Sequence, residues 1–245
     1  MHGTAERRFG IGQPVRRSED PRLLRGQGRY VDDLAPREAL HAVFVRSPHA
    51  HARIVSCDVA TARAVPGVIA VVTGADLRAA GRGSLPCELA VTGDDGRPAR
   101  YPPRLALPHD RARFVGEAVA MVVAETLAAA RDGAEAVAVE WEPLDPVIGI
   151  AAARAAPAIH DAVPGNRVHR WQAGDAAAVE RAFPAAAHTV SGPMRINRVA
   201  VAPLETRGAV ASWDAALGRW TLLAATQGTT EAHGELTRGA LDAAP

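Results

Sequence analysis

The chain has 245 residues, of which 48% are hydrophobic and 22% are charged, the composition of a globular protein with one large domain or two ordinary ones. Its formal net charge of +1 gives no overall electrostatic reason to expect nucleic acid or an anionic membrane as a partner. No window approaches the apolar length of a membrane span, and the N-terminus lacks the apolar core of a signal peptide, so we expect a cytoplasmic protein.

The first 38 residues are rich in Gly, Pro, Arg and Asp and follow neither helical nor strand periodicity, which predicts an extended arm. The pattern then changes to short β-rich runs separated by short helices. We predict strands at 39–46, 52–59 and 68–74, a helix that Asp58 caps and that runs to Arg63, and a second helix at 75–80.

Residues 81–111 carry several prolines and glycines and are predicted to be irregular. After them the order strand, helix, strand is typical of a β-α-β crossover, and it predicts a first domain of mixed α and β that closes near Pro146. The three elements are expected at 117–125, at 127–136 with Thr126 as the helix cap, and at 137–144.

Residues 147–174 lack periodicity and are predicted to be a surface linker. Beyond it we expect a helix at 176–183, capped by Asp175 and stopped by Pro184, strands at 188–192, 207–214 and 219–226, and a helix at 231–243. The last two strands form a hairpin, and the apolar run from Trp220 to Ala225 predicts that the final strand is buried. This second domain, starting near residue 165, has too few strands to close, so the chain needs a partner or is a piece of something larger.

Several polar clusters have a structural and a chemical interpretation. His49 and His51 could share a strand face and bind a metal, but no third ligand lies at a supporting spacing, and a turn with polar packing is favoured. Glu117, at the entrance of a buried strand, could be a general base, although a hydrogen-bond acceptor for backbone or Arg groups is favoured. Cys57 and Cys87 lack a CxxC spacing and are expected to be free thiols.

Two acidic sites are also interpreted structurally. Asp32 and Asp33 could bind a cation, but neighbouring arginines favour solvated ion pairs. Glu205 and Arg207 lie two positions apart in an extended segment, so the arginine can pair the carboxylate. No Walker loop, GxGxxG, GxSxG or HExxH motif occurs in the chain.

Gln227 is the candidate site residue, because it follows the last strand directly and sits in a turn of Thr and Gly. A carboxamide offers a donor and an acceptor without charge, which suits contact with an oxo or amide-like group. Gly228 beside it would permit close approach by a cofactor. A glutamine that only closes a turn is the alternative.

Many stretches, in order along the chain, resemble the molybdopterin-binding large subunit of the molybdenum hydroxylases, the aldehyde oxidase, xanthine dehydrogenase and aerobic carbon monoxide dehydrogenase group. The first part resembles that family's α/β-hammerhead domain, and the later part resembles the opening of its first molybdenum-cofactor domain. The hammerhead stretches are "IGQPVRRSEDPRLLRGQGRYVDDL", "LHAVFVRSPHAHARIVSCDVATARAVPGVIAVVTGADL", "RFVGEAVAMVVAET" and "AVAVEWEPL". The cofactor-domain stretches are "AIHDAVPGN", "GDAAAVERAF", "PLETRGAVA" and "TQGTTEAHGELTRGAL".

The resemblance implies an α+β fold, in which a hammerhead domain precedes an incomplete first molybdenum-cofactor-binding domain. We expect an N-terminal arm at 1–19, the hammerhead domain at 20–146, a linker at 147–164 and the start of the cofactor domain at 165–245. It further implies oxidation or hydroxylation of an aldehyde, N-heterocycle or carbon monoxide with oxygen from water. Electrons would pass from molybdenum-molybdopterin, in its cytosine dinucleotide form, to 2Fe-2S and FAD on partner subunits.

In this family the glutamine of the "TQ" turn hydrogen-bonds an oxo ligand of molybdenum, and Gln227 with Gly228 matches that position. The family chain is much longer, and its glycine-rich cofactor loop and its general-base glutamate lie beyond the matched region. We therefore expect no catalytic residue and no metal ligand in this chain, and an active site completed by another polypeptide. The alternative is a non-catalytic remnant or docking module derived from that subunit.

Overall fold

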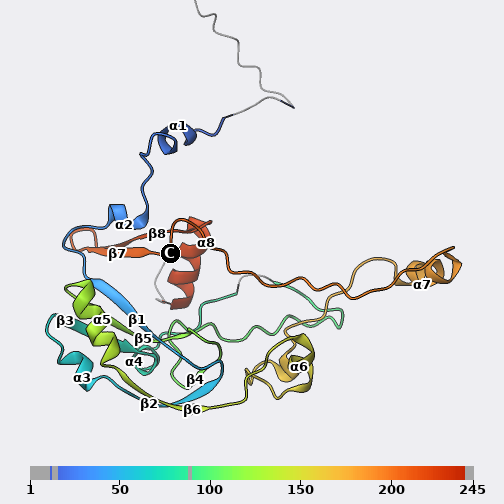
Figure 1. The fold of residues 1–245 in the computed structure, drawn as a ribbon, viewed down its shortest axis with the longest axis horizontal. Helices are drawn as coiled ribbons and strands as arrows, with labels where there is room; N and C mark the ends of the chain where they lie inside the picture. The colour runs from blue at the N-terminus through green and yellow to red at the C-terminus, as the bar shows by residue number, and fades with distance from the viewer. Residues whose placement is uncertain (1–11, 13–15, 88–89, 241–245) are drawn as a thin grey trace, which may run out of the picture. The chain divides into compact units, whose positions relative to one another are not determined.

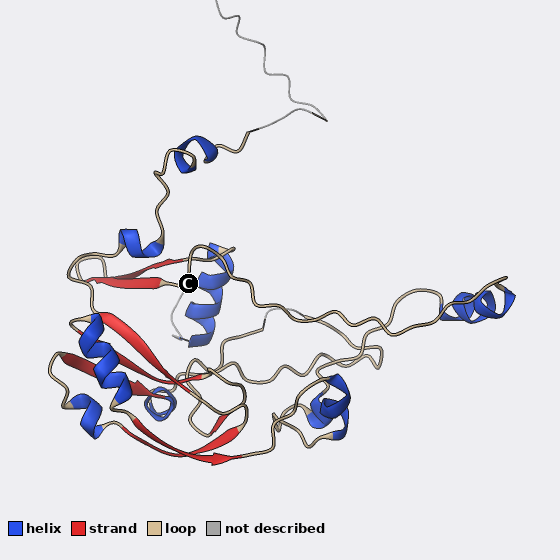
Figure 2. Ribbon diagram, in the orientation of Figure 1, coloured by secondary structure: helices blue, strands red, loops and turns tan. Residues whose placement is uncertain are grey.

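The computed structural model describes Gly12, residues 16–87 and residues 90–240 (Figure 1). The chain forms two compact units, one made of Met1–Arg37 and Ala200–Ala225, the other of Glu38–Val199 and Thr226–Pro245. The larger unit contains both helices and strands, so it has the mixed α and β character that the sequence predicted (Figure 2).

One sheet of the larger unit has the strand order β1-β5-β3, and both pairings are antiparallel. β5 is the central strand, and each of its residues is buried or half-buried. A continuously apolar run is the expected sequence for such a strand, because both of its faces are covered. The strands are β1 (His41–Arg46), β5 (Ala118–Ala124) and β3 (Val68–Thr73).

A second sheet has the order β4-β2-β6 and is also antiparallel. The predicted β-α-β crossover is therefore wrong, because β5 and β6 belong to different sheets. β1 and β3 occupy both edges of β5, so β6 pairs with β2 instead. The strands are β4 (Arg111–Ala112), β2 (Ala52–Asp58) and β6 (Ala138–Pro143).

Three helices of the larger unit, α4, α5 and α7, begin at a side-chain cap. Thr126 Oγ1 accepts the Ala129 N–H at 3.1 Å, and Thr73 and Asp76 form a reciprocal capping box. Asp58 differs from the prediction: the N-cap is Val59, and the Asp58 carboxylate accepts the Ala60 N–H at 2.9 Å. The helices are α3 (Ala60–Arg63), α4 (Gly74–Ala79), α5 (Leu127–Glu135), α6 (Ile150–Ala155), α7 (Ala176–Ala185) and α8 (Thr229–Glu235), with a 3₁₀ turn at Pro164–Asn166 and a π-helical turn at Leu236–Ala240.

The core consists of small side chains, and Val122 is the largest of those that are fully buried. α5 lies on the sheet of β1, β5 and β3. A Cβ on Gly133 of α5 would lie 2.8 Å from Val68 Cγ2 and 2.9 Å from Val122 Cγ1, so the glycine lets helix and sheet approach closely. Small residues in both layers therefore set this spacing.

Three segments outside the core differ from the sequence predictions. α6 lies inside the predicted linker, and α7 continues one residue past Pro184 instead of stopping there. The strand predicted at 188–192 is absent: residues 187–203 have no regular secondary structure, because no partner strand lies beside them in the described part of the chain.

The smaller unit holds the hairpin of β7 (Ala209–Asp214) and β8 (Arg219–Ala224) with the short helices α1 (Asp20–Leu23) and α2 (Val31–Leu34). The Asp214 carboxylate accepts the N–H groups of Ala216 and Leu217 in the hairpin turn, as the predicted hairpin requires. The predicted burial of β8 is wrong, since five of its six residues are exposed. A buried strand needs a covering layer, and a sheet of two strands does not supply one.

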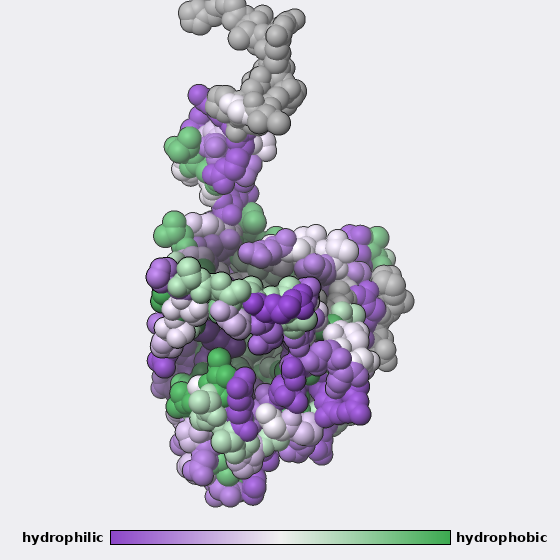
Figure 3. Space-filling view, turned by 90° about the vertical axis from the view of Figure 1, so that its right-hand side faces the viewer, coloured by the Kyte–Doolittle hydropathy of each residue, from purple (hydrophilic) through white to green (hydrophobic). Residues whose placement is uncertain are grey.

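Large apolar side chains are correspondingly exposed in the described residues. Trp213 and Trp220 pair across the hairpin with ring centroids 5.2 Å apart, yet 51% and 61% of their surfaces face solvent. On one face of the molecule hydrophobic residues lie among hydrophilic ones (Figure 3). No helix between residues 16 and 240, outside the undescribed pair 88–89, combines the length and apolarity that crossing a membrane requires. The strands of the second domain therefore expose apolar surface, as their small number predicted.

We expect Gly74→Ala to destabilise the larger unit by roughly 1–3 kcal/mol. A Cβ there would collide with the Pro108 carbonyl oxygen and lie 2.7 Å from the Leu107 carbonyl oxygen, and a backbone cannot rotate away as a side chain can. Urea unfolding measures the difference. Gly192→Ala is the matched control, because its Cβ would meet nothing within 4 Å; equal losses in both variants would contradict the packing.

We also expect trypsin to cut the full chain at Arg195 or Arg198 earlier than at Arg53, because both lie in an exposed stretch that lacks regular secondary structure. Proteases need an accessible segment without backbone hydrogen bonds, whereas Arg53 lies in β2 between two partner strands. A time course read by intact mass and N-terminal sequencing identifies the first cut. Cleavage after Arg53 before Arg195 would contradict this order.

Candidate functional site

Gln227 lies in the bend that precedes α8, and its side chain is exposed. Its carboxamide has no hydrogen bond to any of the residues that the structure describes, so both the donor and the acceptor are free. A glutamine that merely closed a turn would bond to the turn's backbone. The geometry therefore leaves the Gln227 side chain available to a group outside the described chain.

The turn is instead closed by Thr226. Its Oγ1 accepts the Gly228 N–H at 3.3 Å and donates to the Gly228 carbonyl at 3.3 Å. Gly228 is the N-cap of α8, with φ −144° and ψ 108°, a conformation that any residue can adopt. What the glycine contributes is the absence of a side chain: a Cβ there would lie 3.0 Å from the Glu231 carboxylate.

α8 is held by the irregular segment 81–111. Arg104 Nη1 lies 3.5 Å from Glu235 Oε1 and donates to the Pro86 carbonyl at 3.2 Å. The Arg104 N–H also donates to Ser84 Oγ at 2.7 Å. The Arg104–Glu235 pair is half exposed and weak by itself, but the same arginine fixes the loop against which the helix rests.

The π-helical turn that follows α8 packs against the same loop. Gly239 approaches Pro86 so closely that a Cβ on the glycine would collide with the proline ring. Thr237 is buried, and its hydroxyl donates to the His233 carbonyl at 2.8 Å. These contacts fix the helix that starts beside Gln227. Sequence reasoning missed Arg104, because its partner Glu235 lies 131 positions away and no local pattern marks the pair.

The two histidines of the "PHAH" stretch turn to different partners. His49 packs edge-on against Trp141 at 5.7 Å between ring centroids, and His51 Nδ1 lies 2.9 Å from the Asp145 carbonyl. Both lie in the turn between β1 and β2, as the structural interpretation predicted. Within the described ranges no group of three or more His, Cys, Asp or Glu is arranged to hold a metal ion.

Glu117 is a structural acceptor. Its Oε2 accepts the Arg113 N–H at 2.6 Å, and this contact closes the loop before β5. Burial raises the pKa of the Glu117 carboxyl, against the opposing effect of the Arg113 N–H and of the Arg113 charge. The Arg113 guanidinium pairs with a different carboxylate, since Nη2 lies 3.3 Å from Asp110 Oδ2. Glu117 thus accepts a backbone hydrogen bond, as the structural interpretation of this residue predicted.

Two of the remaining acidic candidates, Asp33 and Glu205, bond to backbone groups. Asp33 accepts the Tyr30 N–H at 2.8 Å as part of the cap of α2, which differs from the predicted ion pair. Glu205 Oε1 accepts the Val31 N–H at 3.1 Å. This contact joins two distant stretches of the sequence within the smaller unit, and it replaces the expected pairing with Arg207.

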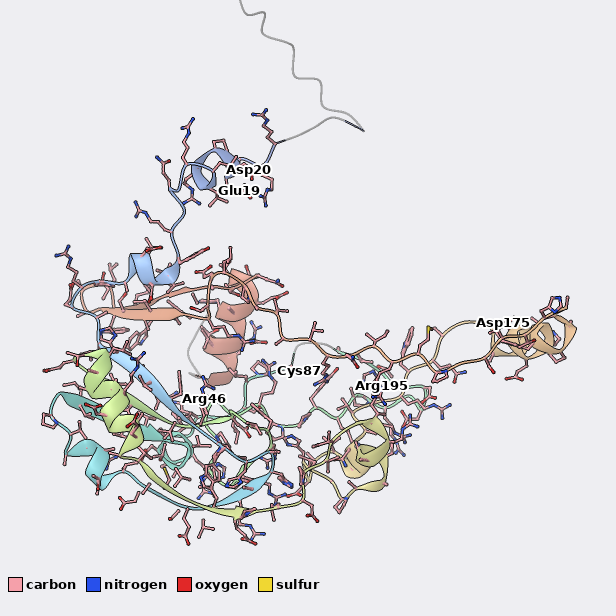
Figure 4. The ribbon with its side chains drawn as sticks, in the orientation of Figure 1. Glu19, Asp20, Arg46, Cys87, Asp175 and Arg195 are labelled. Atoms are coloured by element: carbon pink, nitrogen blue, oxygen red, sulfur yellow. The ribbon has the colours of Figure 1, made fainter. Side chains whose placement is uncertain are left out.

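Both cysteines are free thiols, as predicted. Cys57 packs against the core of the larger unit, and burial, followed by the charges of Asp76 and Asp58, raises the pKa of its thiol. Cys87 is exposed in the 81–111 segment (Figure 4). Burial and the two carboxylates therefore disfavour the reactive thiolate form of Cys57.

Comparison with known proteins places both regions. Residues 25–145 match the "Aldehyde oxidase and xanthine dehydrogenase, a/b hammerhead domain", and residues 159–242 match the "Molybdopterin cofactor-binding domain". The nicotine 6-hydroxylase large subunit of Paenarthrobacter nicotinovorans is 40% identical over 220 residues, and the match covers 89% of this chain and 26% of that protein. The carbon monoxide dehydrogenase large chain of Afipia carboxidovorans is 36% identical over 233 residues, covering 89% and 27%.

Among solved structures, quinoline 2-oxidoreductase from Pseudomonas putida 86 superposes with a TM-score of 0.80 at 37% identity, over 93% of this chain and 28% of that one. The chain thus spans about a quarter of the length of the curated relatives it matches. Gln227 and Gly228 fall inside the matched cofactor-binding region, and Arg104 falls inside the matched hammerhead region.

We expect Glu117 to make the stability of the larger unit fall as pH rises above about 4.5, the carboxyl's ordinary pKa. Because the folded pKa is raised, the unfolded chain releases this proton first, so the stability that the protonated group contributes is lost as pH passes through the folded pKa. Glu117→Gln keeps an acceptor for the Arg113 N–H but cannot ionise. Its stability relative to wild type should therefore rise between pH 4 and 7, as measured by urea unfolding; a pH-independent difference would contradict this.

Proposed function

Because this chain belongs to the molybdenum hydroxylase family, in the aldehyde oxidase and xanthine dehydrogenase group, we propose that it forms the N-terminal part of a molybdopterin-binding large subunit. The complete subunit oxidises or hydroxylates an aldehyde, an N-heterocycle or carbon monoxide, with water as the oxygen source. The proposal is supported by relatives named for nicotine, carbon monoxide and quinoline. The domain boundaries proposed are 20–146 for the hammerhead domain, 147–164 for the linker and 165–245 for the start of the cofactor domain.

The observation that carries this proposal is the unpartnered carboxamide of Gln227 at the start of α8, inside the region that matches the molybdopterin cofactor-binding domain. A free donor and acceptor on a turn suit a neutral contact with an oxygen on molybdenum. Gly228 presents no side chain beside it, so the cofactor can approach the backbone. When bound, molybdopterin supplies a metal that accepts the electrons of the oxidation.

The described residues hold only one side of such a site. No polar side chain among the described residues bonds to Gln227. The general-base glutamate that the family implies is expected in the polypeptide that completes the subunit. The role of Gln227 is therefore to orient an oxygen ligand on the metal, and α8, held by Arg104, keeps it in position.

The partners follow from the same family. We propose that another polypeptide region completes the large subunit, and that separate subunits carry 2Fe-2S clusters and FAD. The cofactor would be the cytosine dinucleotide form. Free Cys57 and Cys87 suit a reducing compartment, which supports the cytoplasm as the location.

Co-expression tests the proposal. The full chain is produced with the polypeptide that completes the large subunit and with the two partner subunits, and molybdenum per complex is measured by mass spectrometry. Dye reduction is then assayed with an aldehyde, an N-heterocycle and carbon monoxide. We expect stoichiometric molybdenum and turnover of one substrate class; a complex without molybdenum would favour the non-catalytic docking module instead.

Gln227→Ala should lower kcat by about 10–100-fold, the usual effect of losing an outer hydrogen bond to a metal ligand. Gln172→Ala is the matched control, since Gln172 is also an exposed glutamine within the matched cofactor-binding region. The molybdenum spectrum of the resting enzyme should change in the first variant only. If Gln227→Ala kept the wild-type kcat and the wild-type molybdenum spectrum, the role proposed for Gln227 would be wrong.

A further inference from the structure

The segment between α7 and β7 has the sequence of a strand but no strand partner. From Thr189 to Asn197 the even-numbered residues are Val190, Gly192, Met194 and Ile196, and the odd-numbered residues are polar except for Pro193. Such alternation is the pattern of a half-buried strand. In Figure 4 Arg195 lies on this stretch, which follows the helix that begins after the labelled Asp175.

The apolar phase is almost completely exposed. Val190 and Met194 expose 95% of their surface, and Ile196 exposes 96%. Isolated exposed apolar residues are common, but three in one strand phase are not scattered. The backbone is equally free: residues 188–199 make no backbone hydrogen bond to any part of the chain that the structure describes. A strand-like backbone and an apolar face are thus both without a partner.

Pro193 decides which edge of this segment can pair. In a strand the N–H and C=O groups of successive residues point to opposite edges, so the odd-numbered residues share one edge and the even-numbered residues share the other. Proline has no N–H, so it interrupts the odd edge. Val190, Gly192, Met194 and Ile196 present an uninterrupted even edge.

Gly192 lies between Val190 and Met194 in the same phase. A Cβ there would meet nothing within 4 Å, so neither the chain's conformation nor its described contacts require a glycine. Its absent side chain leaves a notch in the apolar face. Glycine in a strand often marks a place where another backbone comes close.

We propose that residues 188–197 form an edge β-strand on a sheet of the polypeptide that completes the large subunit. The even edge carries the backbone hydrogen bonds, and the side chains of Val190, Met194 and Ile196 are buried against that polypeptide. This inference rests on the proposed function. Two observations identify the partner of this strand. The chain spans about a quarter of the length of its relatives, so most of the large subunit lies in another polypeptide region. Within the matched cofactor-binding region the structure describes only a two-stranded sheet, and an added strand can pair with a sheet of the completing polypeptide.

The first experiment measures amide exchange by residue, in the full chain alone and in the co-expressed complex. On assembly the amides of residues 190, 192, 194 and 196 should slow by ~100-fold or more, while those of 189, 191, 195 and 197 stay fast. Protection of both sets would make the segment an internal strand and overturn the edge assignment. Even-edge protection in the chain alone, with dimers in light scattering, would identify a second copy as the occupant and overturn the proposal.

Variants test the same edge independently. Gly192→Pro removes a donor from the even edge and should weaken assembly by ~10-fold or more, whereas Ser191→Pro removes one from the odd edge and should not. Met194→Glu and Ile196→Glu put a charge on the apolar face and should weaken assembly too. Thr189→Glu and Asn197→Glu are matched controls that carry the same charge on the other face.

The two proposals fail in different ways. A complex that holds molybdenum and responds to Gln227→Ala, but leaves residues 188–197 exchanging freely, overturns the edge strand and leaves the proposed function standing. A chain that binds none of the completing polypeptide overturns both. Two further results also overturn the edge strand. One is equal weakening of assembly by Gly192→Pro and Ser191→Pro, which would show no preference between the two edges. The other is equal weakening by the glutamate variants on the two faces.

Discussion

The larger unit is organised around β5, whose two edges are both paired and whose seven residues are all at least half buried. A strand enclosed in this way can bind no further strand, so β6 joins β2 in a second sheet. α5 then covers the first sheet at a spacing that Gly133 permits. Because both edges of β5 are paired, the strands of this unit are divided between two sheets.

The site depends on this unit through a loop. The 81–111 segment carries Arg104 and Pro86 to α8, so the helix that starts beside Gln227 rests on the hammerhead unit although it belongs to the region matched to the cofactor domain. A functional glutamine is useful only if its backbone is fixed. The free carboxamide and the fixed helix are the two observations on which the role proposed for Gln227 rests.

The cofactor-domain part shows the opposite condition. The β7–β8 hairpin and residues 188–197 expose the apolar side chains that a sheet would bury. Their sequences are those of strands, and what they lack is a neighbour. The chain therefore has the composition of a globular protein but exposes apolar strand residues. This accords with a chain that spans about a quarter of the length of its relatives.

The sequence by itself determined the helix starts at Thr126 and Asp175, the hairpin turn at Asp214, the free thiols and the family, because caps and turns act over three or four residues and the family motifs are contiguous. It misjudged the crossover and the burial of β8, and it did not find Arg104. Those features depend on which distant segments meet, and hydrophobic periodicity is the same whether or not a partner strand is present. Only the tertiary structure showed that β5 has no free edge, that residues 188–197 make no backbone hydrogen bond to the described part of the chain, and that the Gln227 carboxamide makes none to a described residue.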